Sequence, residues 1–368
     1  MYWTAVMAGF SIVVDFGFGY VGGRELAKRE FDFVAVSELY FSILGARFLV
    51  FVVASVLLYL IVFLSPDRMQ VSMVYPLVLS GLVGALISPN WLLLALRMTG
   101  CVALSGFSGQ LFLLLGSYFF VENESDIWVA LLVQCFSPLV SSIFASLFVF
   151  FFVRPDCYFV SISESVSMLG KSFRMFLATS SAAAYSAINP FIVGFFLAPD
   201  FVSAFALAER IVKAFIGLIS PVLSALYPYS IRRAQGDGFW DGRITIAVLI
   251  SAVILVVLLN VVAESLVLYF GGVGFSHAVP IVRVLSFNIF FVVIGNVAGI
   301  HWLGAKGYDR SVLAVTGIAA ILYVVFFPLI ISRAGIVAGA WGLLAIEVFV
   351  GLGLFLIALI VKNKGLKI

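Results

Sequence analysis

Charged residues are scarce in this sequence: they make up 11% of its 368 residues, whereas hydrophobic residues make up 64%. Soluble globular chains are roughly 25% charged and roughly 45–50% apolar, because polar side chains must cover their surface. A soluble protein of this composition would lack that cover. The sequence therefore excludes an ordinary soluble enzyme and predicts an integral membrane protein.

Cysteine and histidine are also rare. Cys101, Cys135 and Cys157 are odd in number, and the first two lie in apolar runs, where cysteine is typically a small buried hydrophobe. His277 and His301 lie far apart in the sequence. We therefore expect no disulfide framework, no metal site and no cofactor. A membrane glycosyltransferase or polymerase would need paired catalytic carboxylates or a large outer loop, which the short predicted loops do not offer, so we do not expect an enzyme.

Long apolar runs fill most of the chain. A helix that crosses a bilayer needs about 20 predominantly apolar residues. By that rule the sequence predicts an all-α membrane protein with about eleven spans, at residues 2–22, 36–64, 71–96, 100–121, 127–153, 172–197, 201–228, 244–270, 280–303, 311–331 and 336–361. The connections are short, except for those at 154–171 and 229–243.

Lysine and arginine are distributed unevenly between alternate loops. Fifteen of the 21 basic residues fall on one predicted side of the membrane, and only Arg68 and Arg333 fall on the other. Loops rich in lysine and arginine face the cytoplasm. We therefore expect the loop after the first span and the C-terminus to be cytoplasmic.

The start of the chain does not fit a complete bundle. Met1 enters an apolar run that has no basic flank and is too long for a signal peptide. We therefore expect a twelve-span design from which the first helix is missing. The long connection then separates an N-terminal lobe of five helices (1–153), a cytoplasmic linker (154–171) and a C-terminal lobe of six helices (172–368). Paired lobes are typical of transporters.

Four glycines and a basic exit close the first span, in the stretch DFGFGYVGGRELAKRE (residues 15–30). Gly17, Gly19 and Gly22 fit the GxGxxG pattern, but the dinucleotide-binding motif requires a strand before it and a βαβ unit around it. An apolar span precedes it here. We therefore predict that these glycines serve helix packing or bending, and we expect no nucleic-acid partner.

Charged residues inside the predicted spans are the candidate functional residues. Each costs roughly 2.5–3.5 kcal/mol near the middle of the membrane, so it usually faces a partner or a watery cavity. Four acids and four bases fall in this class: Asp15, Glu209, Glu264, Glu347, Arg47, Arg210, Lys213 and Arg283. Glu209 and Lys213 lie four residues apart and share a helix face, so they can pair. For Glu264 and Arg283, near the outer ends of their spans, we expect a structural pair.

Three of the bases lie near the middle of their spans, and central bases in a cavity suit an anionic substrate. These are Arg47, Arg210 and Lys213. Proline follows a polar residue at 137–138, 189–190 and 220–221, and we expect these dipeptides to interrupt their spans. Such breaks are tolerated only where protein or cavity water satisfies the backbone.

The stretch VDFGFGYVGGRELAKRE (residues 14–30) resembles the signature at the end of the second helix of bacterial polysaccharide-repeat flippases. These Wzx-type polysaccharide biosynthesis proteins form a branch of the MATE-like (MOP) exporter superfamily. Further stretches that are similar to the family lie at 89–91, 208–213, 220–221, 227–228, 274–285 and 335–347. The chain departs from the family after Trp91, where Leu94, Ala95 and Arg97 replace a usual Gln-Gly-x-Glu run.

The resemblance implies a two-lobed MATE-like helical bundle in the bacterial cytoplasmic (inner) membrane. It implies a flippase that moves an undecaprenyl-pyrophosphate-linked oligosaccharide from the cytoplasmic to the periplasmic leaflet by alternating access, for assembly of O-antigen, capsule or exopolysaccharide. The implied partners are membrane lipid, a polysaccharide polymerase, a chain-length regulator and a coupling cation, H⁺ or Na⁺.

The expected site residues fall into three groups. Arg47, Arg210 and Lys213 would bind the pyrophosphate or an acidic sugar. Asp15, Glu209 and Glu347 would couple transport to the cation, and Arg24 with Glu25 would form a cytoplasmic gate. Two alternatives stay open at this point: a MATE-like exporter of a drug or metabolite, and a truncated remnant without function.

Overall fold

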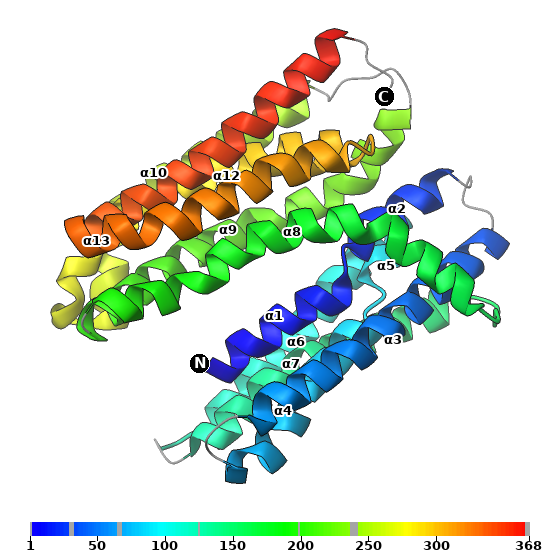
Figure 1. The fold of residues 1–368 in the computed structure, drawn as a ribbon, viewed down its shortest axis with the longest axis horizontal. Helices are drawn as coiled ribbons and strands as arrows, with labels where there is room; N and C mark the ends of the chain where they lie inside the picture. The colour runs from blue at the N-terminus through cyan, green and yellow to red at the C-terminus, as the bar shows by residue number, and fades with distance from the viewer. Residues whose placement is uncertain are drawn as a thin grey trace. The chain divides into compact units, whose positions relative to one another are not determined.

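The computed structural model describes residues 2–28, 33–64, 68–123, 126–197, 199–235 and 242–364, and these residues form helices and no strand. The chain divides into two compact units, which we name unit 1 (Met1–Phe176) and unit 2 (Leu177–Ile368). Within each unit the helices lie roughly side by side (Figure 1). The all-α membrane fold predicted from the apolar runs is confirmed.

The described residues of unit 1 form seven α-helices and the start of an eighth. These are α1 (Tyr2–Asp15), α2 (Phe18–Lys28), α3 (Phe33–Phe63), α4 (Arg68–Ile87), α5 (Asn90–Ala95), α6 (Thr99–Phe120), α7 (Ile127–Phe148) and α8 (Ile162–Phe196). A π-helical turn, η2 (Val149–Val153), extends α7. The long helix α8 runs from unit 1 into unit 2 and begins ten residues before the predicted span, within the stretch expected to be a linker.

Unit 2 continues α8 and adds α9 (Pro199–Gln235), α10 (Gly242–Gly271), η3 (Val273–Ala278), α11 (Val279–Ser286), α12 (Asn288–Gly295), η4 (Asn296–Gly304) and α13 (Asp309–Lys364). The predicted span at 280–303 is therefore a chain of short pieces, with a π-helical segment at its end. The helix α13 covers two predicted spans, and its backbone kinks between them at Gly335, where φ is 78°.

Nine stretches of the described residues are long and apolar enough to cross a membrane. They correspond to the predicted spans with two differences. The last two predicted spans form one stretch, Asp309–Lys362, because no loop separates them. The predicted span at 172–197 is not among the stretches found in the described residues; its helix, α8, starts ten residues earlier and carries Glu164, Lys171 and Arg174 in its first half.

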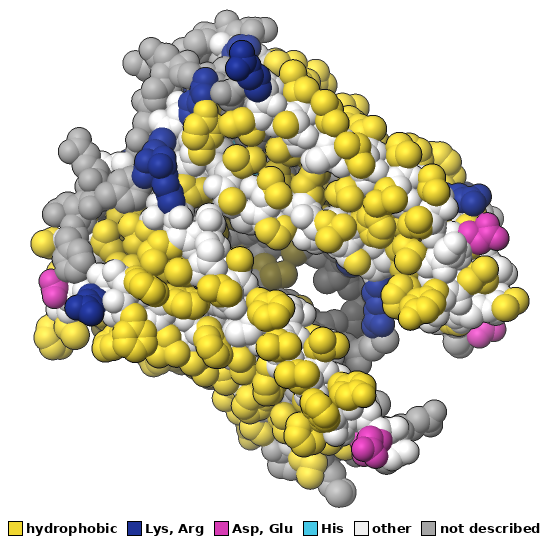
Figure 2. Space-filling model, turned by 180° about the vertical axis from the view of Figure 1, so that it is seen from behind, with side chains coloured by type: hydrophobic (Ala, Val, Ile, Leu, Met, Phe, Trp, Pro, Cys, Tyr) yellow, Lys and Arg dark blue, Asp and Glu magenta, His cyan; other side chains and the backbone are white. Residues whose placement is uncertain are grey.

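The lateral surfaces are apolar. Figure 2 shows hydrophobic side chains over most of the visible face, with charged side chains in small groups. Exposed large hydrophobic residues occur in both units, for example Phe107, Phe150 and Val261, which are 62%, 68% and 75% exposed. Such a surface is stable only in contact with lipid, because a water-soluble protein rarely exposes large apolar patches.

Small residues allow close helix packing inside unit 1. The core between α1, α3, α4 and α7 contains Met7, Val14, Leu58, Val78 and Leu82, all buried. A Cβ atom built on Gly84 would lie 2.8 Å from the backbone nitrogen of Leu139, so α4 and α7 approach to backbone contact there. Small residues serve this purpose in membrane helices, where lipid supplies no hydrophobic drive for association.

We expect Gly84→Ala to lower the free energy of unfolding of the protein by about 1–3 kcal/mol, the usual cost of an overpacked core. The added methyl group would meet backbone, which cannot move aside as a flexible side chain can. Gly106→Ala on α6 is the matched control, because nothing lies within 4 Å of its added Cβ. Thermal unfolding of both variants in detergent checks this; equal melting temperatures would contradict the close contact.

Candidate functional site

The first predicted span is two helices separated by a break at Phe16 and Gly17. Both residues have left-handed backbones, with φ of 47° and 71°, so the chain turns between α1 and α2. Glycine adopts this conformation without a Cβ penalty. The Phe16 ring stacks on Phe176 of α8 at 4.3 Å between centroids. At Gly22 an added Cβ would lie 2.7 Å from the Trp91 ring. The glycines therefore serve bending and packing, as predicted.

Arg47 lies beside this break and is 4% exposed. Its Nη2 atom is 2.6 Å from Asp15 Oδ1, at the end of α1. Its Nη1 atom donates to the carbonyl oxygen of Ser88, just beyond the end of α4. The guanidinium also lies 5.9 Å from the centroid of the Phe18 ring. One arginine on α3 thus holds the ends of two interrupted helices.

The Ser88 contact has a simple physical cause. Where a helix ends, its last carbonyl groups lose their partners within the helix, and in lipid no water replaces them. An arginine side chain carries five donors in a planar fork and can satisfy such groups. The structure places Arg47 in this role and pairs it with Asp15, a candidate for ion coupling. The role of Arg47 in binding a cargo stays a prediction.

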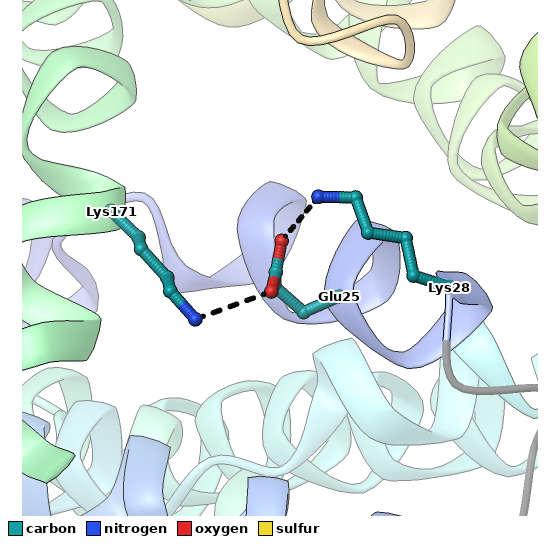
Figure 3. A network of polar contacts seen from close by, with 3 residues as sticks. All are labelled: Glu25, Lys28 and Lys171. Atoms are coloured by element: carbon teal, nitrogen blue, oxygen red, sulfur yellow. Dashed lines mark hydrogen bonds and ion pairs between the residues drawn. The ribbon is translucent and has the colours of Figure 1, made fainter.

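The two gate candidates, Arg24 and Glu25, lie on α2. Glu25 forms an ion-pair network with two lysines (Figure 3). Its Oε1 atom is 2.7 Å from Lys28 Nζ, and its Oε2 atom is 3.4 Å from Lys171 Nζ on α8. Lys171 lies 146 residues away in the sequence, at the predicted end of a loop, so no pattern pointed to this pairing. The gate itself stays a prediction.

Unit 2 contains a pocket of about 190 Å³. It brings together Glu209 and Lys213 from α9 with Glu347 from α13, three residues that the sequence singled out. Two buried amides, Asn189 of α8 and Asn288 of α12, join them. The lining is completed by apolar side chains of Val212, Ile216, Leu285, Val292 and Leu343.

Glu209 is held on two sides. It is 7% exposed, and its Oε1 atom accepts a hydrogen bond of 2.5 Å from Asn189 Nδ2. Its Oε2 atom lies 3.7 Å from Lys213 Nζ, one helical turn further on. The expected pair between Glu209 and Lys213 is confirmed. A buried carboxylate in apolar surroundings needs such partners, because an isolated charge there would cost many kcal/mol.

The other intramembrane charges lie elsewhere. Arg210 is exposed on α9 and is not among the residues that line the pocket. Glu264 and Arg283 form the expected structural pair at 3.9 Å, with both side chains more than half exposed. The polar–proline dipeptides at 137–138 and 220–221 do not interrupt their helices, contrary to the prediction: Pro138 and Pro221 lie inside α7 and α9. The third dipeptide, at 189–190, lies within the bounds of α8.

Sequence reasoning missed the two pocket amides. Asn189 entered only as part of a proline dipeptide, and Asn288 did not enter at all. Both are buried, at 0% and 7% exposure, and the Oδ1 atom of each has no hydrogen-bond partner among the described residues. A buried polar atom is normally satisfied, so an orphaned one in a pocket indicates a place for water or a ligand. The signal in the sequence that could have identified both residues is a polar amide side chain within an apolar stretch.

The pocket can therefore offer one ammonium, two carboxylates and two amides to a polar or charged guest. In the part of the chain that the structure describes, no group of three or more His, Cys, Asp and Glu residues is placed to hold a metal ion.

Comparison with known proteins identifies the family. Residues 1–233 match the family described as "Polysaccharide biosynthesis protein", and the chain belongs to it. The chain is 26% identical over 333 residues to "Putative O-antigen transporter" of Escherichia coli (strain K12), covering 88% of this chain and 80% of that one. A protein of the same name from Shigella dysenteriae is 23% identical over 231 residues, covering 61% of this chain and 56% of that one.

Solved structures show the same fold at lower identity. A MATE protein in the straight conformation superposes with a TM-score of 0.72 at 16% identity, covering 99% of this chain and 86% of that one. A MOP superfamily transporter from Pyrococcus furiosus also gives 0.72, at 14% identity, over 98% of this chain and 86% of that one. The family and the MATE-like fold that the sequence motifs implied are both confirmed.

Proposed function

We propose that this protein is a flippase of the cytoplasmic membrane that moves an undecaprenyl-pyrophosphate-linked oligosaccharide to the periplasmic leaflet. The observation that carries the proposal is the family match over residues 1–233, together with a relative named as an O-antigen transporter that aligns with 88% of the chain. The cargo would serve surface polysaccharide assembly, and the protein would work by alternating access.

The chemistry of the cargo suits the site. A pyrophosphate-linked sugar head is anionic and polar and cannot enter hydrocarbon, whereas its lipid tail can stay in the bilayer. Lys213 offers an ammonium that is 54% exposed at the unit 2 pocket, and Arg210 offers a second exposed cation one turn before it. A basic side chain inside the membrane is energetically costly, so it usually serves to bind a substrate or to conduct an ion. We assign the first contact with the phosphates to Lys213.

The acids of the site suit coupling to a cation gradient. Glu209 and Glu347 line the same pocket as Lys213, so a proton or Na⁺ at either carboxylate would change the electrostatic potential at the cargo site. Asp15 is 48% exposed and pairs with buried Arg47 in unit 1. We assign coupling to the unit 2 acids and a positioning role to the Asp15–Arg47 pair.

Deletion of the gene in its own host tests the proposal. We expect the cells to lose surface polysaccharide and to accumulate lipid-linked repeat units in the cytoplasmic leaflet, with both effects reversed by the gene on a plasmid. Sidedness is measured by the access of an impermeant sugar-modifying reagent to the lipid-linked units in spheroplasts. Normal polysaccharide in the deletion strain would refute the proposal.

The fold alone favours one other function, the export of a drug or metabolite, because the structural neighbours include MATE proteins at a TM-score of 0.72. Their identity of 16% supports the fold and no substrate. An exporter of this kind predicts raised drug sensitivity and unchanged polysaccharide in the same deletion strain, so one experiment separates the two functions.

A further inference from the structure

The ion pair at the unit 2 pocket has two unlike members. Glu209 is buried, and a 2.5 Å hydrogen bond from Asn189 fixes it in addition to its lysine contact. Lys213 is 54% exposed, and its Nζ atom lies 3.7 Å from the Glu209 carboxylate, beyond the usual 2.7–3.2 Å of a direct N–H···O bond. The acid is therefore the fixed partner and the base is the movable one.

Lys213 can change partner without a movement of its helix. A lysine ammonium sits on a flexible four-carbon stem and carries three donors, so it can turn toward a new anion by rotation about its side-chain bonds. Most of the remaining lining is apolar, and Glu347 is the other carboxylate of the pocket; the apolar residues are Val212, Ile216, Leu285, Val292 and Leu343.

We propose that Lys213 leaves Glu209 for the pyrophosphate of the cargo, and that Glu209 then takes up one proton. The cargo class rests on the proposed function. In this exchange the N–H⁺···O⁻ contact between Lys213 and Glu209 breaks and a contact between Lys213 and a phosphate oxygen forms. A proton from water adds to the Glu209 carboxylate. No covalent bond between heavy atoms changes, and the entering proton offsets one negative charge of the cargo.

The groups that face Glu209 favour this uptake. Glu347 of α13 lines the same pocket, so departure of the lysine leaves two carboxylates there. Like charges that share a site disfavour full ionisation of both. The other neighbours are neutral: Asn189 of α8, Asn288 of α12 and the Tyr323 phenol of α13. Arg210 on α9 is exposed and is not among the lining residues. The orphaned Oδ1 atoms of the two asparagines supply acceptors for a carboxylic acid proton or a water beside it.

In this exchange, binding of the cargo favours protonation of Glu209, and protonation of Glu209 favours binding of the cargo. A ligand that binds together with one proton gains up to about tenfold in affinity for each unit fall in pH, over the range in which the proton is taken up. A coupling Na⁺ in place of the proton would remove this pH dependence.

Binding of farnesyl pyrophosphate to the purified protein in detergent tests the exchange. We expect the wild-type affinity to rise at least several-fold between pH 8 and pH 6. Glu209→Gln mimics the protonated acid, so it should bind tightly with only the pH dependence of the pyrophosphate itself. Lys213→Gln should bind weakly at both pH values. Arg283→Gln, which alters an exposed structural pair, is the matched control and should behave as wild type.

The decisive readout is the difference between wild type and Glu209→Gln. Equal pH dependence in the two proteins would overturn the exchange and leave the proposed function standing. Absence of farnesyl pyrophosphate binding by the wild type at both pH values would overturn the exchange, and the deletion strain tests the proposed function separately. A pH indicator in weakly buffered solution gives a second measure: about one proton taken up per bound pyrophosphate by the wild type, beyond that seen with Glu209→Gln. If Lys213→Gln fails to fold, this comparison still decides.

Discussion

Replacing Asp15 by alanine is expected to destabilise the protein by about 3–5 kcal/mol, more than the replacement of its partner Arg47 by methionine. The reason lies in the unequal burial of the pair. Arg47 is 4% exposed and Asp15 is 48% exposed. Loss of the acid leaves a buried guanidinium without this counter-charge, whereas loss of the base leaves a carboxylate that water or headgroups can reach.

A double-mutant cycle measures the effect. Thermal unfolding in detergent should show the Asp15→Ala protein melting on the order of 10 °C below wild type, with Arg47→Met in between. The double variant should be more stable than Asp15→Ala alone, because the uncompensated charge is gone. Arg47→Met still leaves the Ser88 carbonyl without its donor, so it should not be neutral. A larger loss from Arg47→Met than from Asp15→Ala would contradict the role of Arg47 as the buried member.

Hydropathy was sufficient to predict the fold class, because about 20 apolar residues in a row have few outcomes other than a spanning helix. It could not predict where helices break. The breaks at 16–17 and 88–89 depend on a left-handed backbone and on a donor for freed carbonyls, and Arg47 is distant in sequence from Ser88. The interior prolines Pro138 and Pro221 did not break their helices, because packed neighbours hold a helix together despite one missing donor.

The candidate site was only partly visible from the sequence. Counting intramembrane charges found Glu209, Lys213 and Glu347, which do share a pocket. The same count treated Arg47 and Lys213 alike, although Arg47 is buried against two helix ends and Lys213 is 54% exposed. Burial depends on tertiary packing, which a single-residue count cannot report. The amides of Asn189 and Asn288 carry no charge, so a count of charged residues did not include them.

Lys213→Gln is expected to abolish export of the lipid-linked cargo while the protein still inserts in the membrane. A charge-assisted hydrogen bond contributes about 1.5–3 kcal/mol, which corresponds to roughly a tenfold to hundredfold loss of affinity for the phosphates. Lys213→Arg keeps the charge and should retain a large part of the activity. Arg210→Gln should have a smaller effect, because Arg210 is not among the residues that line the pocket.

Complementation of the deletion strain checks this expectation, with surface polysaccharide as the readout and protein level in the membrane fraction as the control. Arg283→Gln is the matched control, because it removes one arginine that lies in a predicted span but outside the pocket. This variant should complement fully. The comparison shows whether complementation depends on the position of the lost charge or only on the number of charges. If Lys213→Gln complements as well as wild type at equal protein level, Lys213 does not bind the cargo, and the phosphate contact must be sought at Arg210.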